Sequence, residues 1–230
     1  MKISIIIPVY NEAQIIKETI EQLLIKQNRP AHIKEIIVVD GGSDDNTRNI
    51  VEKIEGITLI VSQKSRPLQM NIGAKHAKAD VLYFIHADCV PPQNYDKLII
   101  EAVKNKHKAG CFKMKFEHDH LWIQFISWLT KFNARACRGG DQSLFVTKRL
   151  FEFVEGYNEK FMIFEDHELI GNLYKHTRFK VIQKTLFCSA RRFKEKGILK
   201  LQLLFWAIYF KKWLGASPDG LYRFYAKYID

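Results

Sequence analysis

Residues 81–91 read Val-Leu-Tyr-Phe-Ile-His-Ala-Asp-Cys-Val-Pro, an apolar run that ends in a single carboxylate, Asp88. A run this apolar is typical of a strand buried on both faces of a parallel sheet. Ligands of open α/β sheets lie at the carboxyl ends of the strands. We therefore predict that Asp88 and His86 belong to a metal or phosphate site. The alternative, in which Asp88 only caps the turn into Pro91, stays open.

The same pattern occurs twice earlier in the chain. Residues Ile3–Val9 run into Tyr10-Asn11-Glu12, and a second apolar run, 36–39, leads into Asp40-Gly41-Gly42-Ser43-Asp44-Asp45. An acid such as Asp40 at a strand end is suited to bind a base or a ribose, and glycines after it allow a ligand to approach the backbone. A tight turn with an Asp helix cap is the alternative. We expect the three strand ends to share one rim of the sheet.

Length and composition indicate one globular domain, since the chain has 230 residues, 47% of them hydrophobic and 27% charged. We expect no secretory leader, and no apolar run reaches the roughly 20 residues of a membrane-spanning helix. The cysteines are scattered without Cys-x-x-Cys spacing, which favours neither a zinc site nor a disulfide framework. We therefore expect a cytoplasmic protein. The four cysteines are Cys89, Cys111, Cys137 and Cys188.

The net charge of +11 is concentrated at the carboxyl end of the chain. From Gly171 onward there are 13 Lys and Arg against 3 Asp and Glu. Such a tail is suited to phosphate, anionic lipid or nucleic acid, although a solvated helix face is as good an interpretation. The aromatic run 204–210, with Lys200, Lys211 and Lys212 around it, is interpreted as a core helix in preference to a helix on the inner face of a membrane.

Strand and helix patterns alternate in the first half, which predicts an α/β fold with a mostly parallel sheet, flanking helices and a helical basic tail. We expect a single domain, 1–230, with parts at about 1–115, 116–190 and 191–230. The expected strands are Ile3–Val9, Glu35–Val39, Thr58–Val61, Val81–Ile85, Ala109–Phe116, Ser143–Val146 and Phe179–Ile182. The expected helices are Ala13–Lys26, Asp45–Ile54, Pro67–Lys78, Tyr95–Asn105, Leu121–Arg135, 165–174, Gly197–Leu214 and Pro218–Tyr228.

Three further groups have the chemistry of a binding or catalytic site. Arg66 begins a helical pattern that includes Asn71, and a helix N-terminus with a cation attracts phosphate. The acids 165–166 follow the apolar segment Phe161–Phe164, where a carboxylate is suited to act as a general base, although the helix dipole alone favours acids there. We expect His167 to be an exposed helix residue. Arg191 and Arg192 could hold a diphosphate.

Taken together, the chain resembles the family 2 glycosyltransferases, which transfer a sugar from a nucleoside-diphosphate donor. The resemblance spans about residues 1–170, and its motifs are highly specific in this combination and order. A narrower resemblance, to short single-domain bacterial members, rests on fewer residues. The family segments are Ile6-Ile7-Pro8-Val9-Tyr10-Asn11-Glu12, Val38-Val39-Asp40-Gly41-Gly42-Ser43-Asp44-Asp45-x-Thr47, His86-Ala87-Asp88 and Phe164-Glu165-Asp166. The subgroup segments are Arg66-x-x-Gln69-Met70-Asn71-x-Gly73-Ala74, Gly140-Asp141-Gln142 and Arg191-Arg192-Phe193.

The resemblance implies the GT-A fold, with a nucleotide-sugar half followed by an acceptor half. It implies an inverting transfer in which Asp166 is the base and Asp88 binds a divalent cation, Mn²⁺ or Mg²⁺. His86 stands where the family has the first acid of an Asp-x-Asp motif, which puts that residue's metal or ribose contact in doubt. The implied donor contacts are Pro8, Tyr10, Glu12, Asp40, Arg66, Asn71, Arg191 and Arg192. The implied acceptor side is Gly140, Asp141, Gln142 and Glu165.

Other classes of function fit less well. A non-catalytic module that binds a nucleotide sugar or a lipid phosphate is the main alternative, although Asp166 stands in its expected context. A nucleotidyltransferase would need an early Gly-rich loop, and a nucleic-acid binder would not explain three acidic strand ends. The sequence does not name the acceptor: a lipid-linked phosphate at the inner membrane face and a soluble molecule fit about equally.

Overall fold

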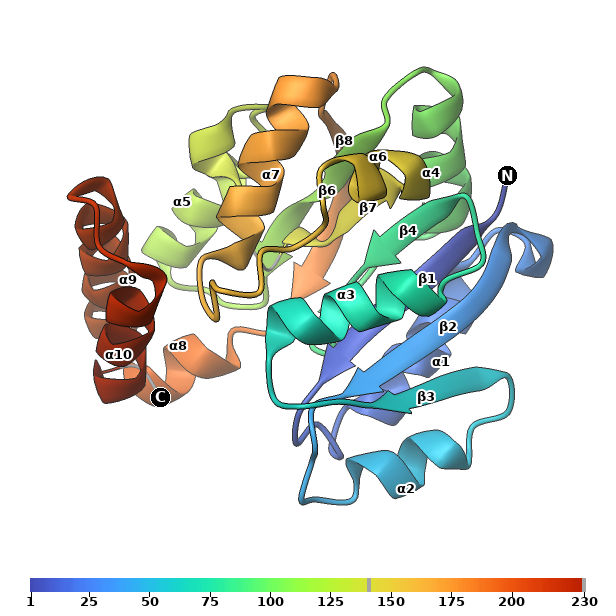
Figure 1. Ribbon diagram of the computed structural model, residues 1–230, viewed down its shortest axis with the longest axis horizontal. Helices are drawn as coiled ribbons and strands as arrows, with labels where there is room; N and C mark the ends of the chain where they lie inside the picture. Colours follow the sequence, from blue (N-terminus) through green and yellow to red (C-terminus); the bar gives the residue numbers. More distant parts are fainter. Residues whose placement is uncertain (140–141, 229–230) are drawn as a thin grey trace.

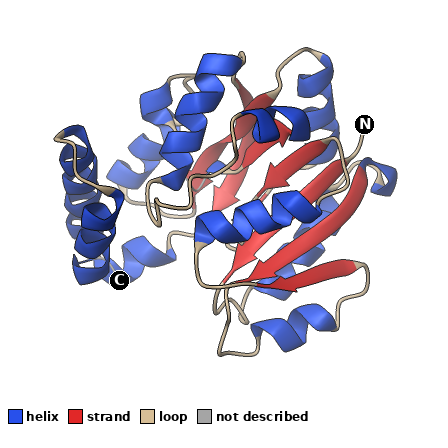
Figure 2. Cartoon of the chain, viewed as in Figure 1, coloured by secondary structure: helices blue, strands red, loops and turns tan. Residues whose placement is uncertain are grey.

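The computed structural model describes residues 1–139 and 142–228. Its core is an eight-stranded sheet with the strand order β3-β2-β1-β4-β7-β6-β8-β5. Helices cover both faces of the sheet, and α9 and α10 form a hairpin at the edge of the molecule far from β3 (Figures 1 and 2). This architecture confirms the predicted α/β fold.

The strands are β1 Ile3–Val9, β2 Ile33–Asp40, β3 Ile57–Val61, β4 Val81–Phe84, β5 Cys89–Val90, β6 Ala109–Phe116, β7 Leu144–Thr147 and β8 Lys180–Cys188. The α-helices are α1 Ile16–Lys26, α2 Thr47–Glu52, α3 Arg66–His76, α4 Tyr95–Lys104, α5 Leu121–Leu129, α6 Lys148–Phe153, α7 Glu165–His176, α8 Arg191–Lys196, α9 Ile198–Trp213 and α10 Pro218–Tyr228. Two short 3₁₀ helices are η1 Pro30–His32 and η2 Arg135–Cys137.

The sheet changes its winding direction at β1. Strands β1, β2, β3 and β4 are parallel, with β2 on one side of β1 and β4 on the other. Beyond β4 the sheet is mixed, because β7 runs antiparallel to both β4 and β6 while β8 runs parallel to β6. Chain reversals of this kind leave a crevice outside the carboxyl ends of the strands, where ligands of α/β sheets bind.

Each face of the sheet packs its own hydrophobic core. Along β4, Val81 and Tyr83 point to the face covered by α1 and α4, while Leu82 and Phe84 point to the face covered by α3, α6 and α7. All four side chains are buried. Two-sided burial is the physical reason why this strand reads as a continuous apolar run.

Helix α3 lies unusually close to the sheet at Gly73. A Cβ atom at this position would lie 2.5 Å from Cγ2 of Ile6 and 3.2 Å from Cγ2 of Val39. From the same helix, Gln69 donates to the carbonyl oxygens of Val9 (2.8 Å) and Val39 (2.7 Å) at the ends of β1 and β2. Close packing and these two bonds hold the start of α3 over the rim.

The second half departs from the expected elements in three places. The helix expected over 121–135 ends at Leu129, because the hydroxyl of Thr130 bonds to the backbone of Ser127 and Met114. The strand expected over 179–182 continues to Cys188 as the partner of β6. The short elements β5, α6 and α8 were not expected, since two to six residues carry too little periodicity to be seen.

The expectation that no disulfide forms is wrong. Cys89 and Cys188 are disulfide-bonded across a sequence separation of 99 residues. They face each other because β5 and β8 are antiparallel neighbours, a pairing that cysteine spacing does not reveal. Cys111 and Cys137 are free thiols.

The interpretation of run 204–210 as part of a core helix holds for one side of the helix, where Leu204, Phe205 and Ile208 pack against or lie in the core, and is wrong for the other. In α9 only Leu201 and Ile208 are buried, whereas Trp206 and Phe210 are more than half exposed. No helix within the described residues has the length and apolar character needed to cross a membrane.

We predict that Gly73→Ala destabilises the fold by about 1 to 3 kcal/mol, because the added methyl group overpacks the contact with Ile6. Helix propensity alone would make the same change stabilising by up to about 1 kcal/mol. Urea denaturation measures the difference. Lys75→Ala, on the exposed side of α3, is the matched control; a Gly73→Ala protein as stable as this control would contradict the close approach.

Candidate active site

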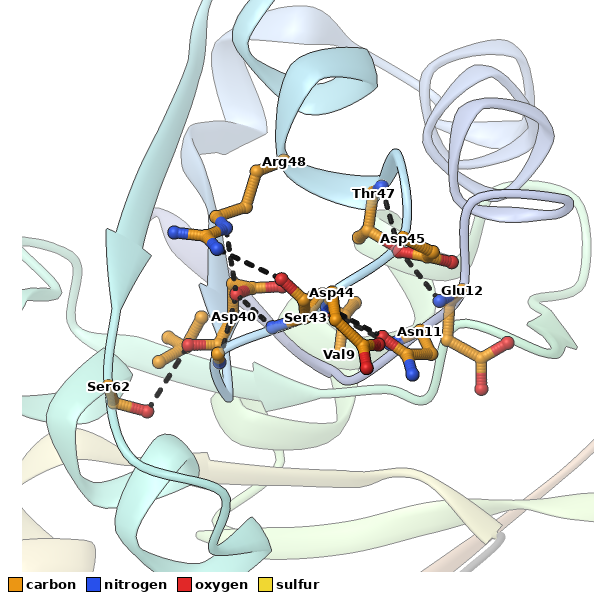
Figure 3. Close-up of polar contacts among 12 residues, drawn as sticks. Val9, Asn11, Glu12, Asp40, Ser43, Asp44, Asp45, Thr47, Arg48 and Ser62 are labelled. Carbon is orange, nitrogen blue, oxygen red and sulfur yellow. Dashed lines mark hydrogen bonds and ion pairs between the residues drawn. The ribbon is translucent and has the colours of Figure 1, made fainter.

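Asp40 ends β2 and organises the loop that follows it (Figure 3). Its fully buried carboxylate accepts hydrogen bonds from the backbone N–H of Gly42 (2.9 Å) and Ser43 (2.8 Å) and from the Ser43 hydroxyl. The Arg48 guanidinium lies 3.6 Å away. Gly42 has a φ of +83°, in the left-handed region that favours glycine. The carboxylate predicted to bind a base or a ribose therefore also holds the shape of its own loop.

The ends of β1 and β2 are joined by side chains from the segments that follow them. Asn11 has a φ of +55°. Its backbone N–H donates to Ser43 Oγ at 2.9 Å, and its side-chain oxygen accepts from Asp44 N at 3.1 Å. Asn11 thus connects the loop after β1 to the loop after β2. The N–H of Glu12 donates to Thr47 Oγ1 at 2.9 Å.

A cation reaches the rim from α8. Arg191 forms an ion pair with Glu12 at 3.1 Å. The hydrogen bond and charge of Glu12, together with the charges of Asp88 and Glu195, raise the pKa of Arg191. The structure thus brings the end of β1, the segment after β4 and the start of α8 together, as the sequence predicted for Glu12, Asp88 and Arg191.

Arg66 connects a second group of predicted residues. Its Nε lies 3.3 Å from Oε1 of Glu165, and one of its terminal nitrogens lies 3.3 Å from Oδ2 of Asp166. The same terminal nitrogen contacts Nε2 of His86. The guanidinium therefore joins the start of α3, the segment after β4 and the start of α7. A cation so close to Nε2 competes with any metal ion for that nitrogen.

The two acids at the start of α7 occupy different environments. The Glu165 side chain is 4% exposed, and burial, followed by the neighbouring charge of Asp166, raises its pKa well above that of an ordinary carboxyl, against the opposing effect of Arg66. Asp166 lines a small pocket with His86 and Gly139, and Tyr157 donates a hydrogen bond to it. The pair therefore divides into a buried acid that keeps its proton and a carboxylate that faces a pocket.

The expectation that His167 is an exposed helix residue is wrong. Its ring stacks on Phe164 at a centroid distance of 4.7 Å, lies edge-on to Tyr209 at 5.0 Å, and hydrogen-bonds to the Tyr209 hydroxyl. Burial, together with the positive charge of Arg135, lowers the pKa of His167 to about 4, against the effect of Glu168. His167 is thus a neutral packing residue that joins α7 to α9.

The structure does not bring every predicted donor contact to the rim. Both ends of the Asn71 amide bond to the 157–159 loop, with Nδ2 donating to Tyr157 O at 2.8 Å and Oδ1 accepting from Tyr157 N at 2.9 Å. Arg192 bonds instead to the hydroxyl of Tyr225 on α10 at 3.2 Å. Tyr10 and Pro8 are half-buried at the end of β1, and Lys64 lies 4.0 Å above the Tyr10 ring.

On the predicted acceptor side, Gln142 is buried and its amide donates to Cys137 O at 3.1 Å, so it does not face the pocket with its amide nitrogen. Gly140 and Asp141 lie outside the described residues. The sequence analysis missed Tyr157 and Lys64, which no motif marks. It also missed Arg138, which is buried and donates to the carbonyl oxygens of Thr130 and Phe132.

A divalent cation would have to rely on few protein ligands. Within residues 1–139 and 142–228 no group of three His, Cys, Asp or Glu side chains is placed to hold a metal ion. Mg²⁺ in phosphate-binding sites is commonly held by one or two carboxylates, with substrate oxygens and water completing the shell. Asp88 at the rim fits that role, whereas a cage made by the protein alone does not fit.

The sheet order and the polar strand ends define an α/β protein of the kind that binds ligands outside the carboxyl ends of its strands. Residues 4–161 match the family model described as glycosyl transferase family 2. The chain belongs to this family.

Two relatives of known name show how similar the chain is in sequence to other glycosyltransferases. The chain is 27% identical over 205 residues to a probable glycosyltransferase, YdaM, of Bacillus subtilis, which covers 77% of this chain and 48% of the relative. It is 28% identical over 120 residues to an undecaprenyl-phosphate 4-deoxy-4-formamido-L-arabinose transferase of Shewanella sediminis, covering 48% of this chain and 36% of the relative. The chain thus spans about half or less of these relatives.

Solved structures agree on the fold. The crystal structure of S. aureus TarS residues 1–349 in complex with UDP-GlcNAc superimposes with a TM-score of 0.68 at 24% identity, covering 82% of this chain and 58% of that one. A second crystal structure of S. aureus TarS 1–349 gives a TM-score of 0.66 at 22% identity. Together with the family match, this likeness confirms the predicted GT-A fold.

We predict that the stability of the protein falls as the pH is lowered from about 6.5 to about 4, because His167 is neutral when folded and takes up a proton more readily when unfolded. Its contribution is present above the unfolded pKa and is lost as the pH falls toward the folded value. The loss from this residue is about 2 to 3 kcal/mol.

Urea denaturation at a series of pH values measures this loss. His167→Phe keeps the ring in place without a proton to gain, so the variant should lose less stability over the same interval. An equal loss of unfolding free energy with falling pH in the two proteins would contradict the lowered pKa of His167.

Proposed function

We propose that the protein is an inverting glycosyltransferase that moves a sugar from a nucleoside-diphosphate donor to an acceptor hydroxyl, with Asp166 as the base. The observation that carries the proposal is the acid pair at the start of α7. Both acids are buried, but only Asp166 lines the small pocket beside His86, whereas Glu165 does not line it and has a raised pKa. Arg66 and Tyr157 both contact the Asp166 side chain.

In the proposed reaction, Asp166 accepts the proton of the acceptor hydroxyl, while the oxygen of that hydroxyl attacks the anomeric carbon of the sugar. The bond from that carbon to the donor diphosphate breaks, and the diphosphate leaves with the electron pair. Arg191 lies at the rim where its guanidinium can add positive charge to the leaving group. Mn²⁺ or Mg²⁺ held by Asp88 and the diphosphate would supply further positive charge when bound.

The donor and acceptor classes have separate support. The TarS structure is a complex with UDP-GlcNAc, which supports a nucleotide sugar as the donor here. The Shewanella relative is named for undecaprenyl phosphate, which supports a lipid-linked acceptor over a soluble one. We propose that Pro8, Tyr10 and Asp40 hold the nucleotide, since they lie at the ends of the neighbouring parallel strands β1 and β2.

We predict that Asp166→Asn lowers the turnover number by about 100- to 10,000-fold while leaving the donor dissociation constant unchanged, because the amide cannot accept the proton. The measurement combines calorimetric titration of UDP-, GDP- and dTDP-sugars with release of the nucleoside diphosphate, using water as the acceptor. Equal loss of binding and turnover would exclude a role as base.

Glu165→Gln is the matched control for this change. An amide resembles a protonated carboxyl in shape, so a Glu165 that keeps its proton should tolerate the substitution with most of the activity retained. The opposite ranking of the two variants would transfer the role of base to Glu165. Full donor binding with no release by the unmodified protein would favour the non-catalytic binding module.

We predict that Asp88→Ala weakens donor binding only in the presence of Mn²⁺, because Asp88 contributes one ligand to a cation that the diphosphate holds mainly by itself. Calorimetry with Mn²⁺ and with a chelator separates the two states. Asp44→Ala, an exposed acid of the β2 loop, is the control for loss of a negative charge near the rim. Identical affinities of Asp88→Ala and the unmodified protein in Mn²⁺ would refute the cation site.

A further inference from the structure

Helix α9 presents an apolar stripe to solvent. The side chains that form it recur at intervals of four, three, four and three residues, so they lie along one side of the helix. Each is more than half exposed, from 51% for Trp206 to 79% for Trp213. The stripe consists of Leu199, Leu203, Trp206, Phe210 and Trp213. In an ordinary surface helix the apolar side faces the core and the polar side faces solvent, whereas this apolar stripe faces solvent.

Helix α5 and the turn after it carry a second stripe of the same kind. Its members are spaced by four, three and four residues and are between 41% and 81% exposed. These residues are Leu121, Phe125, Trp128 and Phe132. The two stripes meet where the ring of Trp122 lies edge-on to that of Trp206 at 5.9 Å and where Trp122 Nε1 donates to Gln202 at 3.2 Å. We call the nine exposed side chains the aromatic face.

The charges along α9 have one sign. The chain has no Asp or Glu between Glu195 and Asp219, a stretch that includes all of α9. Lys200 and Lys211 are exposed on α9, and Lys131 lies 4.2 Å above the Trp128 ring at the end of α5. Along α9, exposed Trp and Phe lie beside Lys without acids, which is the composition of a helix that lies in the interface of an anionic bilayer. The α5 side is more mixed, because the exposed acids Glu117 and Asp119 precede that helix.

We propose that the aromatic face binds the surface of a membrane that contains anionic lipids. The aromatic rings enter the boundary between headgroups and acyl chains, while Lys131, Lys200 and Lys211 contact the lipid phosphates. A second copy of the chain is a poorer occupant, because self-association through this face would bring together two surfaces that both carry lysines along α9. The proposal concerns binding alone and does not depend on the transfer reaction.

The tryptophans make a direct test available. All four tryptophans of the chain lie on α5 and α9, at positions 122, 128, 206 and 213, so intrinsic fluorescence reports on these two helices alone. With vesicles of phosphatidylcholine that contain phosphatidylglycerol, we expect a blue shift of the emission and co-sedimentation of the protein. Vesicles of phosphatidylcholine alone should bind more weakly, and added salt should weaken binding to the anionic vesicles.

The double variant Trp206→Ser, Trp213→Ser should reduce the partition coefficient on anionic vesicles on the order of 100-fold, because two exposed rings no longer enter the interface. The matched control is Ile25→Ser, Phe153→Ser, which removes two side chains that are each 68% exposed but lie on α1 and α6. This control should bind as the unmodified protein does. Lys200→Glu, Lys211→Glu should weaken binding to anionic vesicles only.

Three results would overturn the proposal: no binding of anionic vesicles by the unmodified protein, equal binding by the tryptophan variant, or loss of binding in the control variant. Sedimentation velocity distinguishes the other occupant. A dimer that the tryptophan variant converts to a monomer, without vesicle binding by either protein, would assign the aromatic face to self-association. Circular dichroism checks that each variant is folded, which is expected because the changed side chains are exposed.

Discussion

Two neighbouring carboxylates cannot both be ionised in a poorly hydrated setting unless a cation lies beside them, and in this protein that cation is Arg66. It contacts Glu165, Asp166 and His86, which come from α7 and from the segment after β4. Raising the pKa of Glu165 relieves the remaining repulsion by leaving one acid protonated. The start of α3, held over the rim by Gln69 and Gly73, therefore determines where both acids lie.

At the proposed nucleotide side of the rim, the same residues also stabilise the fold and shape the site. Each loop after a strand is fastened by a side chain from the next loop, so that Asp40, Asn11 and Glu12 form one bonded unit. The hydrogen bonds of these groups fix the conformation of the loops. The loops themselves lie at the carboxyl ends of the strands, where a ligand would bind. Polar residues at these strand ends are thus required even without a ligand, because buried backbone groups need partners.

The first half of the molecule was predictable because its signals are local. Continuous apolar runs identified β1, β2 and β4, and the acids after them lie at one rim, as parallel strands require. The second half was not, because its structure depends on contacts between distant segments. The spacing of the cysteines does not predict the Cys89–Cys188 disulfide. The sequence around His167 likewise does not predict its contact with Tyr209. The Asn71 amide likewise goes to the Tyr157 loop, 86 residues away in sequence.

The attachment of α9 to α7 has a thermodynamic consequence. Tyr209 contacts His167, and Lys212 forms an ion pair with Glu168 at 3.3 Å, so the outermost helix holds the turn that begins with the acid pair. Two sites that share such an element are energetically coupled, and the coupling is reciprocal. A membrane contact that changed the affinity of the crevice through this connection would do so by the same factor by which a ligand in the crevice changed the affinity of α9 for the membrane.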